Sequence, residues 1–407
     1  NVPHLRFPEF SGEWEICKVS ELLDFYSTNS LSWEQLEYGE KAMMNLHYGL
    51  IHVGLPTMVD LRRDKLPNVK EGNMPKNFEL CKEGDVAFAD ASEDTNEVAK
   101  VIELFNLDNK DIVCGLHTIH GRDNKNKTIV GFKGYAFSSS AFHNQIRRIA
   151  QGTKIYSIST KNFSECYVGI PSKAEQTKIA TLLRLIDERI ATQNKIIEDL
   201  KKLKSAISQL LLFKSDLLEK RIPLSEVSAL KNGYPFLSSS YDSTGEYEVL
   251  TIANVTGERY ICSEGCNRIL TKPSDIQFHQ TLKANDILIS LTGNVGRVSL
   301  CKEGKYLLNQ RVGLLQLNSA IVREFIYQVL SSRDFEQSMI SCSQGAAQMN
   351  IGKGDVENYI IPYSGNPKNL LKISSALNSF DTKTLTESRI LQLLNRQKSH
   401  LLTSLFI

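Results

Sequence analysis

Three residues have a spacing close to that of residues that hydrolyse phosphodiester bonds in nucleases. Asp286, Glu303 and Lys305 fit loosely the Asp…Glu-x-Lys arrangement of metal-dependent nucleases. There, carboxylates hold a divalent metal ion and a lysine lies beside the attacked phosphate. The run Glu303-Gly304-Lys305 also fits a charged hairpin turn between residues 298–301 and 306–308. A metal-dependent nuclease is therefore the enzyme alternative for this chain.

Other patterns that bind metals or phosphate are incomplete. Cys262-x3-Cys266 offers two ligands and His117-x2-His120 offers two more, whereas a structural zinc site needs four. The glycines of residues 345–354 lack the spacing and the hydroxyl of a phosphate-binding loop. The Asn/Asp-Pro-Pro-Tyr/Phe signature of methyltransferases is absent. We expect no catalytic residue, no metal and no cofactor in this chain.

The composition is that of a soluble, multidomain protein. The 407 residues suffice for two to four domains, and 41% of them are hydrophobic and 23% charged. No apolar stretch is long enough to span a membrane, and the first residues do not form a signal peptide. Eight scattered cysteines suit a reducing cytoplasm. The net charge of +2 excludes a uniformly basic protein but permits local basic surfaces.

The elements that would position any site are dominated by one long helix. Residues 170–213 are highly charged and contain no proline or glycine after Pro171. Pro171 and Ser172, followed by Glu175, are typical of a helix start. Apolar side chains recur at heptad spacing, at Ile179, Leu182, Ile186, Ile196, Leu200, Leu203, Ile207 and Leu210. This pattern predicts a helix of about 40 residues whose apolar seam needs a partner helix.

The partner is a second copy at the C-terminus. A shift of 194 residues superposes the first seam on the second, and it aligns Asp187 with Asp381 and Lys204 with Lys398. The expected core of the helix pair consists of Ile179, Ile186, Ile196, Leu200 and Ile207 with Ile373, Phe380, Ile390, Leu394 and Leu401. Short stretches upstream of both helices also match, so the repeat includes the preceding globular regions.

The sequence therefore predicts an α+β protein with two globular domains separated by two long helices. The expected segments are 1–170 and 220–362 for the globular domains, and 171–219 and 363–407 for the helices. The helices would pair antiparallel as an intramolecular coiled coil, which makes the chain pseudo-twofold symmetric. Two different heads at a fixed separation suit DNA, whose helical repeat sets the spacing between two readers.

Two motifs carry a resemblance to a known family. The opening Leu5-Arg6-Phe7-Pro8-Glu9-Phe10-Ser11-Gly12-Glu13-Trp14 resembles the N-terminus of specificity (S) subunits of type I restriction-modification enzymes. The run Ile170-Pro171 to Glu175-Gln176 and Leu185-Ile186-Asp187 resembles the central conserved region of that family. The second helix departs from the pattern, because it starts at residues 362–368 without a Glu-Gln pair.

The resemblance implies a DNA-recognition subunit without catalytic residues. Its two target-recognition domains would read the halves of an asymmetric, bipartite double-stranded DNA site with an unspecified gap. Two methyltransferase (M) subunits and the restriction (R) subunits would assemble on it. S-adenosylmethionine, ATP and Mg²⁺ would be bound by those partners. A coiled-coil adaptor that binds no DNA is a third interpretation, but it leaves the duplication unexplained.

Polar and basic residues in the turns of the two heads are the candidate DNA contacts. Arginine reads guanine, and asparagine or glutamine reads adenine, by paired hydrogen bonds in the major groove. Arg122, Arg297 and Arg311 are the strongest single candidates, because each lies in or beside a Gly- or Asn-containing turn near a predicted strand end. The full set is Ser92, Thr95, Arg122, Asn124, Lys125, Arg147, Arg148 and Lys154 in the first head, and Thr292, Asn294, Arg297, Asn309, Gln310, Arg311, Gln344 and Gln348 in the second.

Overall fold

The computed structural model describes residues 1–39, 43–343 and 349–407. The chain forms two compact units. The first unit comprises Asn1–Gln193 and Ile390–Ile407, and the second comprises Asn194–Arg389. The division falls inside the two long helices, because each globular region packs on its own part of both helices. Among the described residues, no helix combines the length and apolar character needed to cross a membrane.

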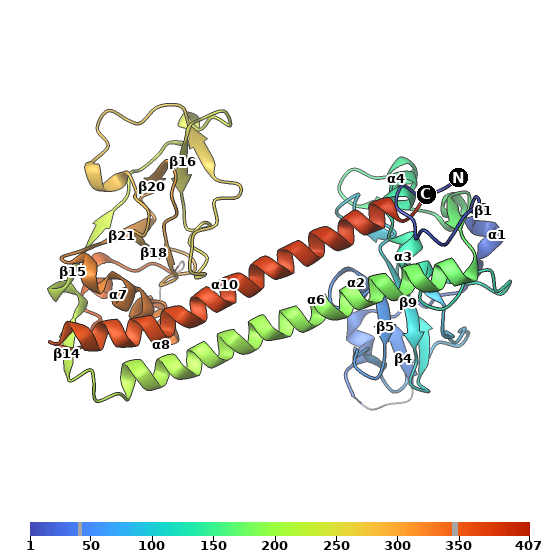
Figure 1. The fold of residues 1–407 in the computed structure, drawn as a ribbon, viewed down its shortest axis with the longest axis horizontal. Helices are drawn as coiled ribbons and strands as arrows, with labels where there is room; N and C mark the ends of the chain where they lie inside the picture. Colours follow the sequence, from blue (N-terminus) through green and yellow to red (C-terminus); the bar gives the residue numbers. More distant parts are fainter. Residues whose placement is uncertain (40–42, 344–348) are drawn as a thin grey trace. The chain divides into compact units, whose positions relative to one another are not determined.

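The first unit holds two small sheets and two ribbons (Figure 1). The larger sheet has the order β2-β11-β7-β9-β5, and the smaller has the order β10-β4-β6-β3. The strands are β1 (Glu15–Lys18), β2 (Asp24–Tyr26), β3 (Leu36–Glu37), β4 (Met43–Leu46), β5 (Met58–Asp60), β6 (Asn68–Val69), β7 (Val86–Ala89), β8 (Ala91–Ser92), β9 (Val101–Asn106), β10 (Asp111–Cys114), β11 (Thr118–Arg122), β12 (Tyr156–Ser157) and β13 (Tyr167–Ile170). The helices are α1 (Val19–Leu22), η1 (Trp33–Gln35), α2 (Tyr48–His52), α3 (Lys133–Phe137), α4 (Ser140–Ile149) and α5 (Thr160–Ser164).

The second unit has the corresponding sheets, ordered β15-β21-β18-β19 and β17-β16-β20. Its strands are β14 (Lys220–Pro223), β15 (Ser228–Asn232), β16 (Tyr247–Leu250), β17 (Asn267–Ile269), β18 (Ile287–Ser290), β19 (Val298–Leu300), β20 (Tyr306–Leu308), β21 (Val312–Leu317) and β22 (Ile360–Tyr363). Its helices are η3 (Leu224–Glu226), η4 (Ser238–Ser240), η5 (Phe278–Gln280), η6 (Ala320–Val322), α7 (Arg323–Leu330), α8 (Arg333–Cys342) and α9 (Lys353–Glu357). The α+β class expected from the sequence is confirmed.

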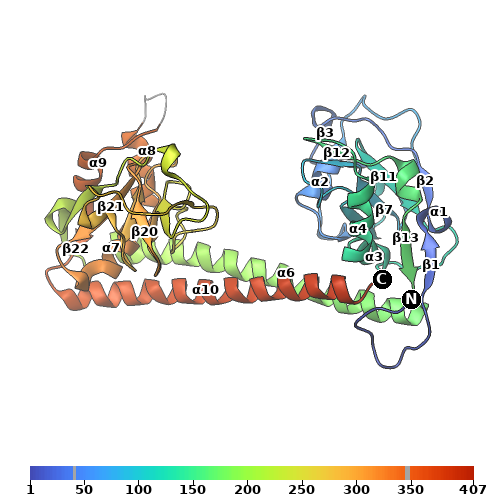
Figure 2. The same cartoon turned by 90° about the horizontal axis from the view of Figure 1, so that it is seen from above.

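The two long helices run through both units. They are α6 (Lys173–Ser208), which ends in the π-helical turn η2 (Gln209–Phe213), and α10 (Pro367–Ser404). Within each unit, a part of α6 lies beside a part of α10 (Figures 1 and 2). The pairing is antiparallel in both units: Lys398 near the end of α10 contacts Asp187 in the first, and Lys204 near the end of α6 contacts Asp381 in the second.

The expected helix core is mostly shielded from solvent. Ile179, Ile186, Ile373 and Leu401 are buried, and the other six expected core residues are partly buried. Leu203 and Leu210, which heptad spacing also places in the seam, are 50% and 52% exposed. The strict heptad prediction is wrong at these two positions, because the apolar face also packs on the globular parts and drifts around the helix.

The topology of the heads is duplicated in detail. In the first unit, β7 lies between antiparallel β11 and β9, and in the second, β18 lies between antiparallel β21 and β19. Both central strands begin after the same turn, in which the side chain of Asp85 or Asp286 accepts a hydrogen bond from the backbone N–H three residues earlier, at 2.8 Å in each case. Gly84 and Asn285 both have positive φ there, as the turn requires.

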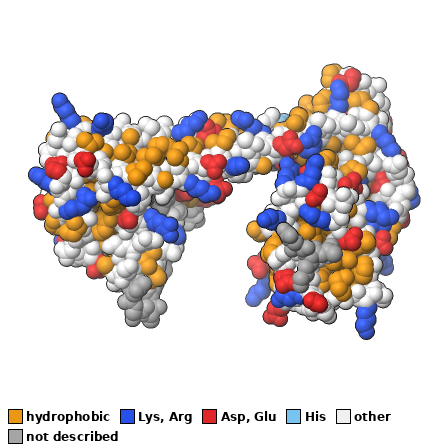
Figure 3. All heavy atoms as spheres, turned by 90° about the horizontal axis from the view of Figure 1, so that it is seen from below, with side chains coloured by type: hydrophobic (Ala, Val, Ile, Leu, Met, Phe, Trp, Pro, Cys, Tyr) orange, Lys and Arg blue, Asp and Glu red, His pale blue; other side chains and the backbone are white. Residues whose placement is uncertain are grey.

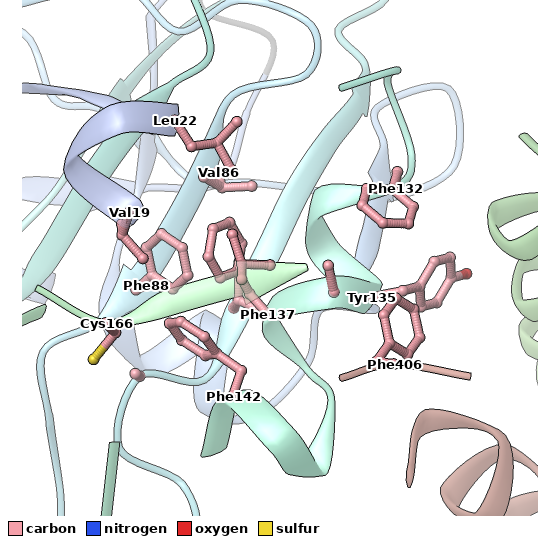
Figure 4. Packing of buried hydrophobic residues seen from close by; sticks show 14 of the residues in the cluster. Val19, Leu22, Val86, Phe88, Phe132, Tyr135, Phe137, Phe142, Cys166 and Phe406 are labelled. Atoms are coloured by element: carbon pink, nitrogen blue, oxygen red, sulfur yellow. The ribbon is translucent and has the colours of Figure 1, made fainter. Parts of the chain in front are cut away.

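Aromatic side chains fill the core of the first unit. Phe88, Phe137 and Phe142 pack together with ring centroids 4.8–5.0 Å apart in neighbouring pairs (Figure 4). Phe406, from the chain's end, packs on Phe132 with centroids 5.9 Å apart. The backbone of residue 5 also bonds residue 404, so both termini lie at this unit (Figure 2).

The opening motif of the chain contacts the start of α6. Arg6 makes a bidentate ion pair with Glu175, with both N···O distances 2.8 Å, and Trp14 donates to the same carboxylate. Gln176 accepts from the N–H of Ile129 and donates to two backbone carbonyls. The Glu-Gln pair therefore ties the helix to the first head rather than only capping it.

The second helix uses a different start. Asn366 precedes Pro367, and its side-chain oxygen accepts a hydrogen bond from the N–H of Lys368 at 3.1 Å. Proline suits the first helical position because it has no N–H to satisfy there. The absence of a Glu-Gln pair is thus compensated by an asparagine cap.

Candidate nucleic-acid interface

One end of the second unit gathers several of the expected DNA contacts. Leu291 follows β18, and its N–H donates to the carbonyl of Arg311, which precedes β21, at 3.0 Å. Thr292 forms a β-bridge with Asn350, and the next residue, Gly293, bonds Met349. We call residues 291–294, 309–311 and 349–350 the second tip.

Two neighbouring side chains at the turn of the second tip lie at the surface. Gln310 and Arg311 are exposed, and the guanidinium of Arg311 makes no ion pair within the described part of the chain. Asn309 differs: it is 8% exposed, and its side chain accepts from the N–H of Arg311 at 3.1 Å. This side chain therefore holds the turn, and its expected contact with DNA stays a prediction.

The first unit has an equivalent tip. The N–H of Asp90 donates to the carbonyl of His117 at 3.1 Å, as Leu291 does to Arg311. Strand β8 pairs with β12, with Ser92 opposite Tyr156, as Thr292 pairs with Asn350. We call residues 90–95, 115–117 and 151–157 the first tip; it contains the candidates Ser92, Thr95 and Lys154.

The structure adds His117 to the candidates. It occupies the position of Arg311, has positive φ, and its ring contacts the Asp90 carboxylate at 3.2 Å. It also lines an open groove of about 690 Å³ together with Tyr48, Ser92 and Ile155. Sequence reasoning paired His117 with His120 instead, but the two side chains bind different partners, Asp90 and Asp85. His117 precedes Arg311 by 194 residues, the same offset that relates the two long helices, so the sequence repeat could have indicated this equivalence.

Arg122 is a correction. It ends β11 rather than lying in a loop, is 7% exposed, and makes a bidentate pair with Asp85 at 2.8–2.9 Å. It also bonds Glu79 and stacks on the ring of Tyr26, 4.4 Å away. Burial alone would raise the pKa of Asp85, but the hydrogen bonds from His120 and Arg122 hold it below its ordinary value. The guanidinium is thus held by contacts within the first unit, and its expected contact with DNA stays a prediction.

The remaining candidate DNA contacts of the first head lie in different parts of the first unit. Asn124 and Lys125 are exposed but bonded to the first unit itself, to Asp24 and Tyr26 and to the carbonyl of Glu21 respectively. Arg147 and Arg148 are exposed at the end of α4, and Lys154 is exposed in the first tip. The structure thus brings Ser92, Thr95 and Lys154 together and places Asn124 and Lys125 in another loop.

In the second head, Asn294 is exposed in the second tip, whereas Arg297 lies beside α8, 3.7 Å from the carboxylate of Glu336. Gln344 and Gln348 lie outside the described residues.

On the face drawn in Figure 3, lysine and arginine side chains are interspersed with acidic ones in each unit.

The alternative nuclease triad receives no support from the geometry. The Asp286 carboxylate holds the turn before β18, and Lys305 forms an ion pair with Glu246. Glu303 and Lys305 do not lie in a hairpin, because β19 and β20 belong to different sheets. Among the described residues, the one group of three metal-ligating side chains that converges lies elsewhere, at Cys81, Cys114 and His120.

Comparison with known proteins assigns the family. The family model described as "Type I restriction modification DNA specificity domain" matches residues 64–202 and 219–396. A search of curated protein sequences finds no match. Among solved structures, the chain is similar to the S subunit of a type I restriction-modification system from M. genitalium, with 17% identity, a TM-score of 0.58, and coverage of 100% of this chain and 99% of that one.

A second similar structure is described by its work on complex assembly and conformational transition of the type I R-M system. It shares 14% identity and a TM-score of 0.58, over 98% of each chain. At these identities the two structures support the fold, and the duplicated sequence match supports the family. The chain belongs to the type I restriction-modification DNA specificity family and carries two copies of its specificity domain.

Proposed function

We propose that this chain reads an asymmetric, bipartite DNA site, with one half-site recognised by each unit. The observation that carries the proposal is the pair of equivalent tips with different side chains. His117 stands in the first where Arg311 stands in the second, and Asp90 stands where Leu291 does. Equivalent positions with different hydrogen-bonding chemistry suit two half-sites of different sequence.

The two tips would combine base readers with phosphate contacts. Arg311 is the base reader of the second unit, because its guanidinium is exposed beside a β-turn and can pair with guanine. Gln310 and Asn294 are exposed in the same tip. In the first unit, Ser92, Thr95 and His117 are the readers, while Lys154, Arg147 and Arg148 contact phosphates and supply affinity without sequence preference.

Assembly completes the proposed function. Two M subunits would bind this chain and methylate adenine with S-adenosylmethionine, and R subunits would add ATP- and Mg²⁺-dependent translocation and cleavage. This chain would do no chemistry and would act in the cytoplasm. The proposal is supported by the family match, by whole-chain similarity to an S subunit, and by the similar structure concerned with assembly of a type I system.

The test is co-expression with the cognate M subunit, followed by purification of the complex and mapping of adenine methylation on plasmid DNA. A single gapped, asymmetric methylated motif is expected. Methylation of a continuous or palindromic motif would contradict the proposal that the two units recognise half-sites of different sequence. If no complex forms and the chain alone nicks DNA with Mg²⁺, the nuclease interpretation replaces this one. If it binds neither DNA nor M subunit, the adaptor interpretation does.

A further inference from the structure

Two thiols and an imidazole converge inside the first unit. Cys81, Cys114 and His120 are all buried, and their potential ligand atoms lie within 4.8 Å of one another. Cys81 precedes the turn into β7, Cys114 ends β10, and His120 lies within β11. The two sulfur atoms are 3.6 Å apart. The three residues therefore connect three separate segments of the chain.

The imidazole is oriented and has one free nitrogen. Nε2 of His120 is 2.7 Å from Oδ2 of Asp85, and the side chain is fully buried. Nδ1 is also buried and has no hydrogen-bond partner in the described chain. A buried polar atom without a partner costs free energy, so a ligand bound to this nitrogen would remove that cost. Because Asp85 occupies Nε2, Nδ1 is the nitrogen that a ligand could use.

The second unit provides an internal comparison. The positions equivalent to Cys81, Cys114 and His120 hold Leu282, Leu308 and Leu314, which belong to one apolar cluster. This fold thus fills the same place with ordinary packing when no ligand is needed. In the first unit, the two cysteines also border an apolar cluster, but the imidazole of His120 adds a polar group that the second unit lacks at this place.

Matching backbone contacts establish that equivalence. The N–H of Cys81 donates to the carbonyl of residue 112 at 2.8 Å, and that of Leu282 donates to residue 306 at 3.0 Å. The carbonyls of Cys114 and Leu308 accept from residues 29 and 234 at 2.9 and 2.7 Å. His120 and Leu314 occupy the same register opposite the central strand, at Ala87 and Leu288.

We propose that the first unit binds a thiophilic d¹⁰ cation, zinc(II) or copper(I), through the sulfurs of Cys81 and Cys114 and Nδ1 of His120. Zinc–sulfur bonds of about 2.3 Å at a tetrahedral angle place two sulfurs about 3.8 Å apart, close to the 3.6 Å seen here. Asp85 then acts as the carboxylate that fixes the ligating histidine. Zinc would add a water molecule as fourth ligand, whereas copper(I) accepts three.

The site would brace the first tip. Cys114 and His120 flank the turn of residues 115–117, so a metal bound to both would hold the two strands on either side of that turn. This proposal differs from the expectation of a metal-free chain, because the three ligands are far apart in sequence. It does not depend on DNA recognition, since metal binding is measured on the chain by itself.

The experiment measures metal in the full chain purified under reducing conditions. Elemental analysis should find about one zinc or copper per chain, and the element found separates the two ions. Cobalt(II) added to the metal-free chain should give a thiolate-to-cobalt charge-transfer band if the site accepts zinc. The variant C81L/C114L/H120L, which copies the second unit, should lose the metal and the band. The control C262S/C266S, which removes two other thiols, should keep both.

Thermal unfolding adds a second measurement, which remains informative even if the triple variant is less stable than the wild-type chain. A chelator should lower the Tm of the wild-type chain and of C262S/C266S, and leave that of C81L/C114L/H120L unchanged. The proposal is overturned by a wild-type chain that takes up none of these ions, by equal metal binding in the triple variant, or by a Cys81–Cys114 disulfide in the reduced preparation.

Discussion

The Nζ atom of Lys398 lies 2.6 Å from Oδ1 of Asp187 and joins α10 to α6 within the first unit. Lys204 and Asp381, each 194 positions from its counterpart, make the same 2.6 Å contact in the second unit. A tyrosine ring lies near both lysines, Tyr135 at 5.9 Å and Tyr327 at 6.0 Å. The sequence repeat is therefore also a repeat of partly buried ion pairs, and it fixes the antiparallel register.

The first prediction follows from the different numbers of side chains that contact the two aspartates. Asp187 also accepts from Tyr135, whereas Asp381 accepts from Arg259 and Gln328 as well as Lys204. D381N should destabilise its unit by about 3 kcal/mol, and D187N its own by about 1 kcal/mol, because Arg259 would lose one of its two carboxylate partners while largely buried. Thermal unfolding of both variants checks this, and equal losses of stability would contradict it.

The sequence predicted what depends on periodicity and repetition. The long helices, their antiparallel pairing and the α+β heads follow from the heptads and the 194-residue offset. The roles of single polar residues were harder, because they depend on partners far along the chain. Arg122 looked like an exposed turn residue, yet Asp85 and Glu79 bury it.

His117 was missed for the related reason that its role appears only when β10 and β11 are superposed on β20 and β21. The cluster of Cys81, Cys114 and His120 likewise has no local spacing that a motif could detect. Leu203 shows the opposite error, since a regular heptad was extended to a position that is half exposed.

The second prediction concerns Arg122. R122A should destabilise the first unit by about 3–5 kcal/mol, because it leaves the buried carboxylate of Asp85 with one cationic partner fewer. The matched control is Gln316→Ala, since Gln316 is the exposed residue at the equivalent place in β21. Unfolding of the full chain measures both. A variant of normal stability that had lost discrimination at one base pair would instead restore Arg122 as a base reader.

The third prediction separates the two heads. R311A should relax discrimination at one position of one half-site by about 1–3 kcal/mol, and H117A should affect only the other half-site. Competition binding with duplexes mismatched in either half measures both effects. The control R221A removes a guanidinium in β14 that donates to the backbone carbonyls of Lys220 and Phe213.

Three results would argue against this assignment of the tips. R311A and H117A could weaken all sequences alike, which would make the residues phosphate contacts. They could also relax the same half-site, or R221A could relax discrimination as strongly as they do.

The fourth prediction tests whether the helices set the gap in the DNA site. Counting along each helix from the Asp187–Lys398 contact and from the Lys204–Asp381 contact gives two segments at matching positions, residues 192–198 of α6 and 387–393 of α10. Deleting both segments removes seven residues, or about 10 Å, from each helix, which corresponds to about three base pairs of DNA. Seven residues are nearly two full turns, so each side of the deletion keeps its facing to within about 20°.

Co-expression of this double deletion with the M subunit should therefore give methylation of the same two half-sites with a gap about three base pairs shorter. Deleting only residues 192–198 is the control: it breaks the register, so that Lys204 no longer faces Asp381 when Asp187 faces Lys398, and methylation should be lost. An unchanged gap in the double deletion would show that the spacing of the half-sites is set by something other than α6 and α10.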